Sequence, residues 1–236
     1  MSKFSSTAMV LAAGLGKRLG DITKNTPKPL VSIGNTCCLD ISIHALKKAG
    51  FKRIIINTHY LAEQIEEYVR RYSDIEIILS YEPVLLETAG GVRNVLSEFE
   101  GKPFVVVNAD MYWVDSNPSV IQQLIKAMQE TDDFCLAVTP LQNAQGHSGK
   151  GDFVIENGLL RRPVDTDPTE NRYVYIGAQI INPRVIQPLS IEPQSLQGLY
   201  FQACAKKTLK GVIFDGTWID VGSVSGLEIA RKYIKD

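Results

Sequence analysis

The chain has 236 residues, of which 44% are hydrophobic and 22% are charged, and its formal net charge at pH 7 is −1. This length allows one large globular domain that buries most of its apolar surface. The small net charge supplies no overall positive field, which argues against a nucleic-acid partner. Every apolar run is shorter than a membrane span, and the N-terminal one ends in a basic loop rather than a cleavage site, so we expect a cytoplasmic protein without a membrane partner.

Strand and helix patterns alternate along the first half of the chain, as they do in a parallel sheet with helical connections. Short apolar or β-branched runs predict strands, and apolar residues at helical spacing predict helices. Thr88 is the expected N-cap of one helix, and Gly50 ends another. The predicted strands are 8–12, 53–57, 75–80 and 104–108, and the predicted helices are 39–49, 61–71 and 89–99.

The second half predicts fewer helices and more short strands. Asn157-Gly158 is a strong signal for a tight hairpin turn. The pattern favours an α/β fold, Rossmann-like and three-layered, with a mostly parallel central sheet in a single domain spanning residues 1–236. The predicted elements are a helix at 119–130, a strand at 134–140, a loop at 142–151, strands at 152–156 and 159–162, a loop at 165–171, a strand at 173–181, a helix at 198–209, a strand at 212–214 and a helix from about 224.

A glycine-rich basic loop follows the first predicted strand. The loop contains Gly14 and Gly16, whose backbone N–H groups can approach phosphate oxygens closely because glycine has no Cβ. Arg18 in the same loop can hold phosphate oxygens with a bidentate fork. Prolines on both sides of Lys28 fix φ and hold this lysine on a stiff segment. The two segments together predict a cradle for a triphosphate.

This loop differs from the two common nucleotide-binding loops. A Walker A motif requires Ser or Thr after its lysine, and here Lys17 is followed by Arg18. The dinucleotide-binding fingerprint is nearly met by Gly14, Gly16 and Gly20, but no helix pattern follows these glycines. We therefore expect a different class of nucleotide-binding protein.

Two aspartates each follow an apolar segment. Asp110 comes just after the predicted strand 104–108, and ligands of open α/β sheets bind beyond the carboxyl ends of strands. Asp220 is far away in the sequence, in Trp218-Ile-Asp-Val-Gly222. One Mg²⁺ needs only one or two protein carboxylates besides substrate phosphates and water. The pair predicts a magnesium site if the fold brings both together, whereas either residue alone fits a turn aspartate equally well.

Six segments together resemble the sugar-1-phosphate nucleotidyltransferase family, whose members join a nucleoside triphosphate to a sugar 1-phosphate and release pyrophosphate. The set most resembles the N-acetylmuramate 1-phosphate uridylyltransferases of bacterial cell-wall recycling. The resemblance implies the nucleotidyltransferase fold, with a nucleotide-binding half at about 1–115 and a sugar-binding half at about 116–236. No hexapeptide repeat occurs, so we expect no β-helix tail. The segments are 11–18, 26–30, 86–92, 107–110, 149–153 and 218–222.

The resemblance also implies individual roles. Asp110 and Asp220 match the metal-binding aspartates of the family, so Mg²⁺ is the expected cofactor. Arg18, Lys28 and Asp110 match catalytic positions. The implied nucleotide-binding residues are Leu11, Ala12, Ala13, Gly14, Gly16, Lys17, Arg18, Glu82, Gly90 and Gly91. The implied sugar-phosphate-binding residues are Lys28, Glu87, Asn108, Lys150 and Asp152.

The substrates implied are UTP and N-acetylmuramate 1-phosphate, and the Ala13 methyl group favours a pyrimidine. Some positions depart from the subgroup. Ala89 adds a methyl group near the expected ligand, and Asp21 places an acid beside the phosphate loop. Two alternatives remain: a guanylyltransferase acting on mannose 1-phosphate or heptose 1-phosphate, and a non-catalytic sugar-nucleotide sensor with the same fold. Intact Arg18, Lys28, Asp110 and Asp220 favour an enzyme. We expect it to work as a monomer or small homo-oligomer.

Histidine and cysteine have no required role in this chemistry. The attacking phosphate oxygen is already anionic and needs no general base, so His44, His59 and His147 need not be catalytic. The four cysteines form no paired Cys-x-x-Cys motifs, which predicts reduced core thiols rather than a zinc site. Redox chemistry at the adjacent Cys37 and Cys38 remains an alternative.

Overall fold

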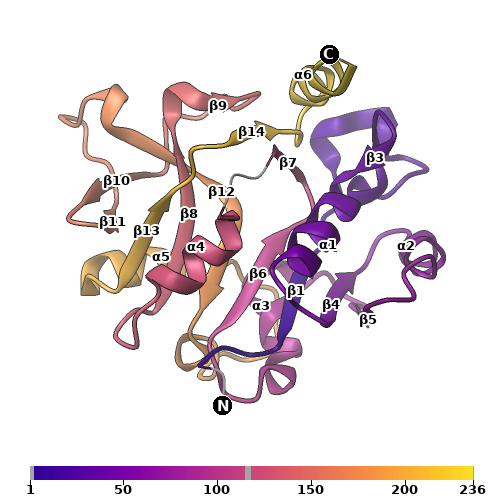
Figure 1. Ribbon diagram of the computed structural model, residues 1–236, viewed down its shortest axis with the longest axis horizontal. Helices are drawn as coiled ribbons and strands as arrows, with labels where there is room; N and C mark the ends of the chain where they lie inside the picture. Colours follow the sequence, from indigo (N-terminus) through magenta and orange to yellow (C-terminus); the bar gives the residue numbers. More distant parts are fainter. Residues whose placement is uncertain (1–2, 115–117, 236) are drawn as a thin grey trace.

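A mixed β-sheet forms the centre of the molecule (Figure 1). The computed structural model describes residues 3–114 and 118–235, and within these residues the largest sheet has nine strands. From one edge to the other the strands are β10 (Phe153–Glu156), β11 (Leu159–Arg161), β13 (Leu209–Ile213), β8 (Phe134–Pro140), β12 (Arg172–Ile181), β6 (Phe104–Asn108), β1 (Thr7–Leu11), β4 (Arg53–Thr58) and β5 (Glu76–Tyr81).

Strand direction changes between the two halves of this sheet. β1 pairs in parallel with β4 and β6, and β4 pairs in parallel with β5. β12 runs antiparallel to both of its neighbours, β6 and β8, and also to β10. β10, β11 and β12 follow one another through short connections, which permit antiparallel pairing and leave no room for a crossover helix. The predicted α/β fold is confirmed, and the expected parallel pairing is concentrated in the first half.

Helices cover both faces of the sheet and produce three layers (Figure 1). Successive side chains of a strand point to opposite faces. Ala8 and Val10 of β1 accordingly pack in one core cluster with α1 (Cys38–Lys48), α2 (Ala62–Val69) and α4 (Val120–Ala127), whereas Met9 packs in another with α3 (Glu87–Asn94) and α5 (Gln197–Lys206). Within residues 3–114 and 118–235, no helix combines the length and apolarity needed to cross a bilayer.

Two small sheets accompany the large one in the described residues, and the three-stranded one joins distant parts of the chain. β14 (Thr217–Asp220) lies between β7 (Met111–Val114) and β9 (Ala144–Gln145), and β2 (Ser32–Ile33) pairs with β3 (Thr36–Cys37). The last helix, α6 (Val224–Lys235), begins where the sequence predicts it. Its Leu227 packs in a third cluster with Leu19, so the end of the chain covers the segment after the glycine loop.

The predicted helix 89–99 is wrong in its bounds. The helix α3 begins earlier, at Glu87, and ends at Asn94, and a separate 3₁₀ turn spans Leu96–Phe99. Thr88 is not the N-cap, because it lies inside α3 and its Oγ1 accepts a hydrogen bond from the Leu196 N–H at 2.8 Å. This long-range contact with the segment before α5 replaces the local bond that the sequence pattern suggests.

Candidate active site

A cavity of about 330 Å³ opens at the carboxyl ends of β1, β4 and β6. We call it the first cavity. It lies where open α/β sheets bind their ligands. It brings together residues from the glycine loop, the proline-flanked lysine, the end of β6 and the start of α3. The predicted site residues among its lining are Leu11, Ala12, Ala13, Gly14, Gly16, Lys28, Glu87, Asn108 and Asp110.

Asn57, at the end of β4, also lines the first cavity and was not predicted. Its Oδ1 accepts a hydrogen bond from the Ala12 N–H, and its Nδ2 donates one to Glu82 Oε1, each at 2.8 Å. Asn57 therefore fixes the backbone just after β1. Asn108 was predicted from the family resemblance, whereas the available signal for Asn57 is its place as a polar residue near the end of an apolar strand.

Glu82, Gly90 and Gly91 do not line the cavity but support its wall. Glu82 is only 1% exposed, and its Oε2 accepts a hydrogen bond from the Leu86 N–H at 2.9 Å. A Cβ on Gly91 would lie 2.7 Å from Glu82 Oε1 and 2.9 Å from Asn57 Nδ2, and a Cβ on Gly90 would clash with the Glu192 carbonyl. These residues are needed for close packing. We expected the Ala89 methyl group to lie near the ligand. Ala89 is instead fully buried in the core, so its methyl group does not approach the cavity.

Lys28 and Asp110 form an ion pair at the edge of the first cavity. Lys28 Nζ lies 2.7 Å from Asp110 Oδ2, and the exposed fractions of the two side chains are 10% and 31%. Lys28 begins a 3₁₀ turn (Lys28–Leu30) that follows the extended Pro27. Asp110 Oδ1 is buried and has no hydrogen-bond partner among the described residues. This oxygen is available to a ligand or a metal ion.

The pairing of β7 with β14 brings the two predicted metal ligands into one region. Asp220 lies opposite Met111, the residue that follows Asp110, and facing Cα atoms of an antiparallel pair lie about 4.5–5.5 Å apart. Asp220 Oδ1 accepts a hydrogen bond from the Gly222 N–H at 2.8 Å. No group of three His, Cys, Asp or Glu converges in the described part of the chain, so two aspartates are what it offers for a cation shared with substrate oxygens.

Arg18 reaches the same region from the glycine loop. A Cβ on Gly222 would lie 2.5 Å from Arg18 Nη2 and 2.8 Å from Asp220 Oδ1, so Gly222 lets the guanidinium and the carboxylate come close. Arg18 and Lys17 line a small cavity of about 250 Å³ that also includes Gly16 and Lys28. This phosphate-loop cavity shares Gly16 and Lys28 with the first cavity, so the two adjoin.

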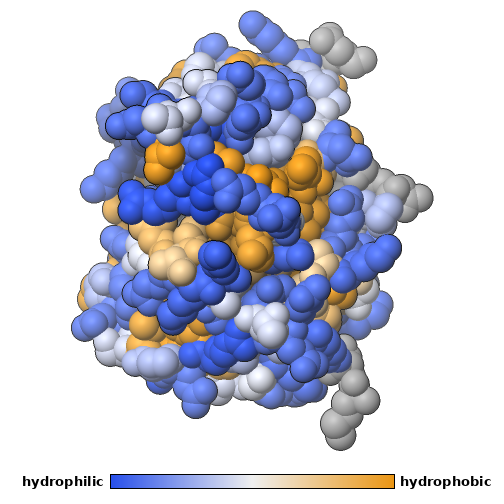
Figure 2. Space-filling view, turned by 90° about the vertical axis from the view of Figure 1, so that its left-hand side faces the viewer, coloured by the Kyte–Doolittle hydropathy of each residue, from blue (hydrophilic) through white to orange (hydrophobic). Residues whose placement is uncertain are grey.

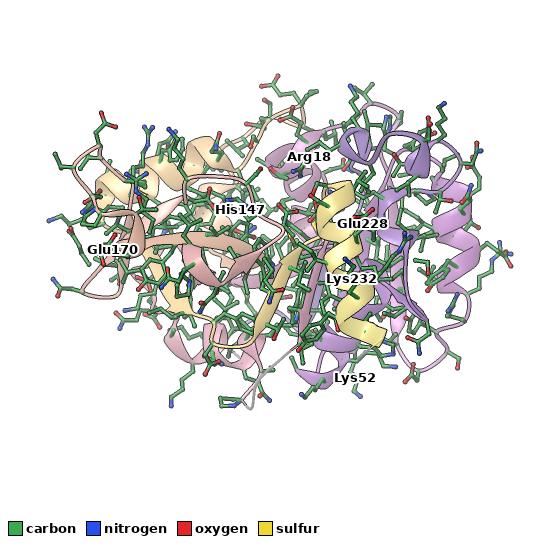
Figure 3. The ribbon with its side chains drawn as sticks, turned by 90° about the horizontal axis from the view of Figure 1, so that it is seen from above. Arg18, Lys52, His147, Glu170, Glu228 and Lys232 are labelled. Carbon is green, nitrogen blue, oxygen red and sulfur yellow. The ribbon has the colours of Figure 1, made fainter. Side chains whose placement is uncertain are left out.

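His147 lies beside Asp220, although no role is predicted for it from the sequence. Its Nδ1 is 3.7 Å from Asp220 Oδ2, and its Nε2 is buried without a partner among the described residues. Figure 3 shows His147 and Arg18 near the centre of the molecule, seen from above. A Cβ on Gly149 would clash with the His147 ring, which explains the glycine at that position.

A second cavity, of about 430 Å³, lies between β10, β12 and α5. Of the residues predicted to bind the sugar phosphate, Asp152 lines this cavity, whereas Lys150 is exposed and lines neither cavity. Asp152 Oδ2 accepts a hydrogen bond from the Tyr175 N–H at 2.9 Å. The full lining is Gly151, Asp152, Phe153, Arg162, Pro163, Arg172, Tyr175, Gln197, Tyr200 and Phe201.

Comparison with known proteins shows to which protein family this chain belongs. Residues 7–151 match the family model described as nucleotidyl transferase. N-acetylmuramate alpha-1-phosphate uridylyltransferase of Caulobacter vibrioides is 30% identical over 229 residues, which cover 94% of each chain. The chain belongs to the nucleotidyl transferase family. Mannose-1-phosphate guanylyltransferase catalytic subunit beta of Drosophila pseudoobscura pseudoobscura is also 30% identical, over 91% of this chain and 58% of its own.

Two solved structures share the fold of this nucleotidyl transferase. UDP-glucose pyrophosphorylase complexed with UDP-glucose superimposes with a TM-score of 0.79 at 20% identity, over 98% of this chain and 99% of that one. HddC from Yersinia pseudotuberculosis superimposes with a TM-score of 0.76 at 20% identity, over 97% and 99%. These two structures support the fold, and the family match with the 30% identical uridylyltransferase identifies this nucleotidyl transferase as a sugar-1-phosphate nucleotidyltransferase.

Proposed function

We propose that this enzyme transfers the uridylyl group of UTP to N-acetylmuramate 1-phosphate, forming UDP-N-acetylmuramate and pyrophosphate. The observation that carries the proposal is the 30% identity to a uridylyltransferase of that specificity over 94% of both chains. A guanylyltransferase subunit also has 30% identity to this chain, but the match covers only 58% of the length of that subunit.

The reaction is an in-line substitution at the α-phosphorus. An oxygen of the sugar phosphate forms the new P–O bond, and the bond to the β-phosphate oxygen breaks as pyrophosphate leaves. The nucleophile is already anionic, so the enzyme has no proton to remove. Positioning and charge stabilisation dominate such transfers.

Arg18 and Lys28 would divide the charge on the phosphates. Arg18, with the backbone N–H groups of the glycine loop, would hold the β- and γ-phosphates in the phosphate-loop cavity. Lys28 lines both this cavity and the first one, so its ammonium group is placed to neutralise the α-phosphate and the incoming sugar phosphate.

Enzymes of this family generally depend on Mg²⁺. The residues of this chain fit the ion, because Asp110 Oδ1 is a buried carboxylate oxygen without a partner among the described residues, and Asp220 is held nearby by strand pairing. Asp110 and Asp220 would hold Mg²⁺, which supplies positive charge to phosphate oxygens during the transfer.

Ala13 would read the base. The Ala12 N–H donates to Asn57, and the Leu11 carbonyl accepts from the Ala109 N–H at 3.0 Å, so both are already used. Uracil presents one N–H donor between two carbonyl acceptors, which complements a backbone N–H and C=O at Ala13. A base whose donor and acceptor do not meet this N–H and C=O in position would leave them unpaired, which gives strong discrimination against that base.

The cavities also support the expected halves of the chain, at about 1–115 for the nucleotide and about 116–236 for the sugar. Apart from Ser195, every residue that lines the first cavity lies between Leu11 and Asp110. The second cavity is lined by residues between Gly151 and Phe201. We propose that the sugar extends from the first cavity towards the second.

A guanylyltransferase acting on mannose 1-phosphate is the second candidate, because a mannose-1-phosphate guanylyltransferase subunit is 30% identical. The test is a panel of UTP, GTP, CTP and dTTP, each with N-acetylmuramate 1-phosphate, mannose 1-phosphate and a heptose 1-phosphate. Pyrophosphate release and mass spectrometry of the nucleotide sugar are the readouts. We expect UTP with N-acetylmuramate 1-phosphate to give the highest kcat/KM. A higher value for GTP with mannose 1-phosphate would refute the proposed substrates and leave the reaction class intact.

A further inference from the structure

The second cavity contains two arginines without carboxylate partners. Among the described residues, neither Arg162 nor Arg172 has a side-chain carboxylate oxygen of Asp or Glu within 4.0 Å. Arg161, adjacent to Arg162 in the sequence, pairs with both Glu156 and Asp167. The Arg162 guanidinium instead lies over the Phe201 ring, 4.2 Å from its centroid. Arg162 thus keeps its hydrogen-bond donors available at the wall of this cavity.

Two buried polar atoms in the lining are unpaired. Arg172 uses its terminal nitrogens on the carbonyls of Lys150, Val164 and Asp167, whereas its Nε has no partner among the described residues. The Tyr175 hydroxyl is likewise buried and unpaired. Native structures rarely leave such groups without a ligand or an ordered water. Both unpaired atoms are donors in the wall of one cavity.

The Tyr175 hydroxyl keeps its proton. Burial raises its pKa well above the ordinary value, and the neighbouring Tyr200 and the carboxylate of Asp110 raise it further. It can therefore donate a hydrogen bond. The carboxylate in the lining, Asp152, accepts from the Tyr175 N–H, and the N-terminus of α5 adds the favourable end of a helix dipole. The lining as a whole suits a ligand group that is anionic and rich in acceptors.

The second cavity lies next to the first. The Gln197 N–H donates to Ser195 Oγ at 3.2 Å, and these two residues line the second and the first cavity respectively. On the opposite side, Gly177 follows Tyr175 by two residues and packs on Asn108, because a Cβ on Gly177 would lie 3.2 Å from Asn108 Cβ. A sugar whose phosphate lies at Lys28 and Asp110 can therefore extend towards Arg162.

We propose that the second cavity binds a carboxylate carried by the acceptor sugar, with Arg162 as the residue that recognises it. This inference rests on the proposed function and deepens it. The acceptor would be a sugar 1-phosphate with a second anionic group, as in N-acetylmuramate with its lactyl carboxylate. Mannose and N-acetylglucosamine carry no such group. Arg162 is then a specificity-determining residue outside the metal and phosphate site.

The test compares Arg162→Ala, Arg162→Lys and Arg161→Ala with the wild-type enzyme. Each is assayed with UTP and either N-acetylmuramate 1-phosphate or N-acetylglucosamine 1-phosphate, which differ only in the lactyl group. We expect Arg162→Ala to lower kcat/KM for the carboxylate-bearing sugar about 10- to 100-fold, as for a lost charge-assisted hydrogen bond. The kcat/KM for N-acetylglucosamine 1-phosphate should stay unchanged, and Arg162→Lys should recover part of the loss. Arg161→Ala should leave the ratio between the two sugars unchanged.

Equal losses for both sugars, or no loss for either, would overturn the inference. A wild-type preference for the sugar without a carboxylate would overturn it as well. The affinities of the enzyme for free N-acetylmuramate and free N-acetylglucosamine, measured by calorimetry, distinguish failure of this inference from failure of the proposed function. If UTP proves to be the wrong donor, preferential binding of N-acetylmuramate that Arg162→Ala abolishes still supports the cavity assignment. Equal binding of the two free sugars contradicts it.

Discussion

Lys28 and Asp110 form an ion pair of 2.7 Å across a sequence separation of 82 residues. The pair joins the turn after the glycine loop to the end of β6. It leaves one Asp110 oxygen unpaired and buried, and it holds the Lys28 ammonium group between the first cavity and the phosphate-loop cavity. Ligands that enter either cavity therefore meet a lysine and an aspartate that are already positioned.

Asp110→Asn tests the metal assignment. We expect it to lower turnover about 10²-fold or more, the scale for losing a transition-state electrostatic group, and to weaken Mn²⁺ binding measured by electron paramagnetic resonance. The wild-type enzyme should be inactive in excess chelator. Asp74→Asn is the control, because Asp74 is exposed, pairs with Lys47 and lines none of the three cavities. Near-normal turnover of Asp110→Asn, or activity in chelator, would contradict the assignment.

Arg18→Ala and Lys28→Ala should affect different kinetic constants. Arg18 lines the phosphate-loop cavity but not the first cavity, so its loss should chiefly raise KM for the triphosphate. Lys28 also lines the first cavity, where charge shifts during the transfer, so its loss should chiefly lower kcat. Steady-state kinetics with Lys24→Ala, a change at an exposed lysine, provides the comparison. Both constants remaining at wild-type values in both variants would show that the proposed geometry is wrong.

Gly91→Ala should disrupt the packing of Glu82 and Asn57, which hold the backbone of the proposed base site. An added Cβ would meet Glu82 Oε1 and Asn57 Nδ2, the two groups that hold the Ala12 backbone. We expect a loss of about 1–3 kcal/mol in the free energy of unfolding, the usual cost of overpacking, and weaker nucleotide binding by calorimetry. In a helix without this clash, Gly→Ala stabilises by about 1 kcal/mol.

Gly198→Ala in α5 is the matched control, because a Cβ there meets no atom within 4 Å. Measured by urea denaturation, the free energy of unfolding should fall in Gly91→Ala and rise in Gly198→Ala, each relative to the wild type. If Gly91→Ala is as stable as the wild type, the support from Glu82 and Asn57 is not as tight as the structure indicates.

The buried thiols should be unreactive in the native protein. Burial raises the pKa of Cys37 and Cys38, and raises that of Cys135 to about 12, so these thiols stay protonated at pH 8. Mass spectrometry after iodoacetamide treatment at pH 8 should show none of the three labelled, and all should label after denaturation. Rapid native labelling of Cys37 or Cys38 would revive the redox alternative.

Local sequence patterns were sufficient for the longer strands. The predicted strands 104–108 and 134–140 have the observed bounds of β6 and β8, because each is a continuous apolar run buried on both faces. The four-residue strands β7 and β14 were not predicted, because neither has its own periodicity and both depend on pairing with segments far away in the sequence. The same holds for the two-residue β9.

The candidate site likewise contains residues that could be predicted from the sequence and residues that could not. Lys28 and Asp110 could be predicted from local pattern, because Lys28 stands between two prolines and Asp110 comes just after an apolar strand, and Asn108 was predicted from the family resemblance. Arg162, Arg172 and Tyr175 could not, because only the pairing of β10 with β11 and β12 and the packing of α5 bring them together. Their cavity depends on contacts between segments that carry no shared motif.

The pairing of β7 with β14 has a consequence for the order in which this protein matures. Asp110 belongs to the first half of the chain, but its partner at the cation site arrives only when β14 takes its place opposite Met111. A nascent chain that ends before Asp220 can hold the nucleotide-loop residues and still lack one of the two carboxylates. Tight divalent-ion binding would therefore report that the last strand is in register, and so serve as a marker of the completed fold.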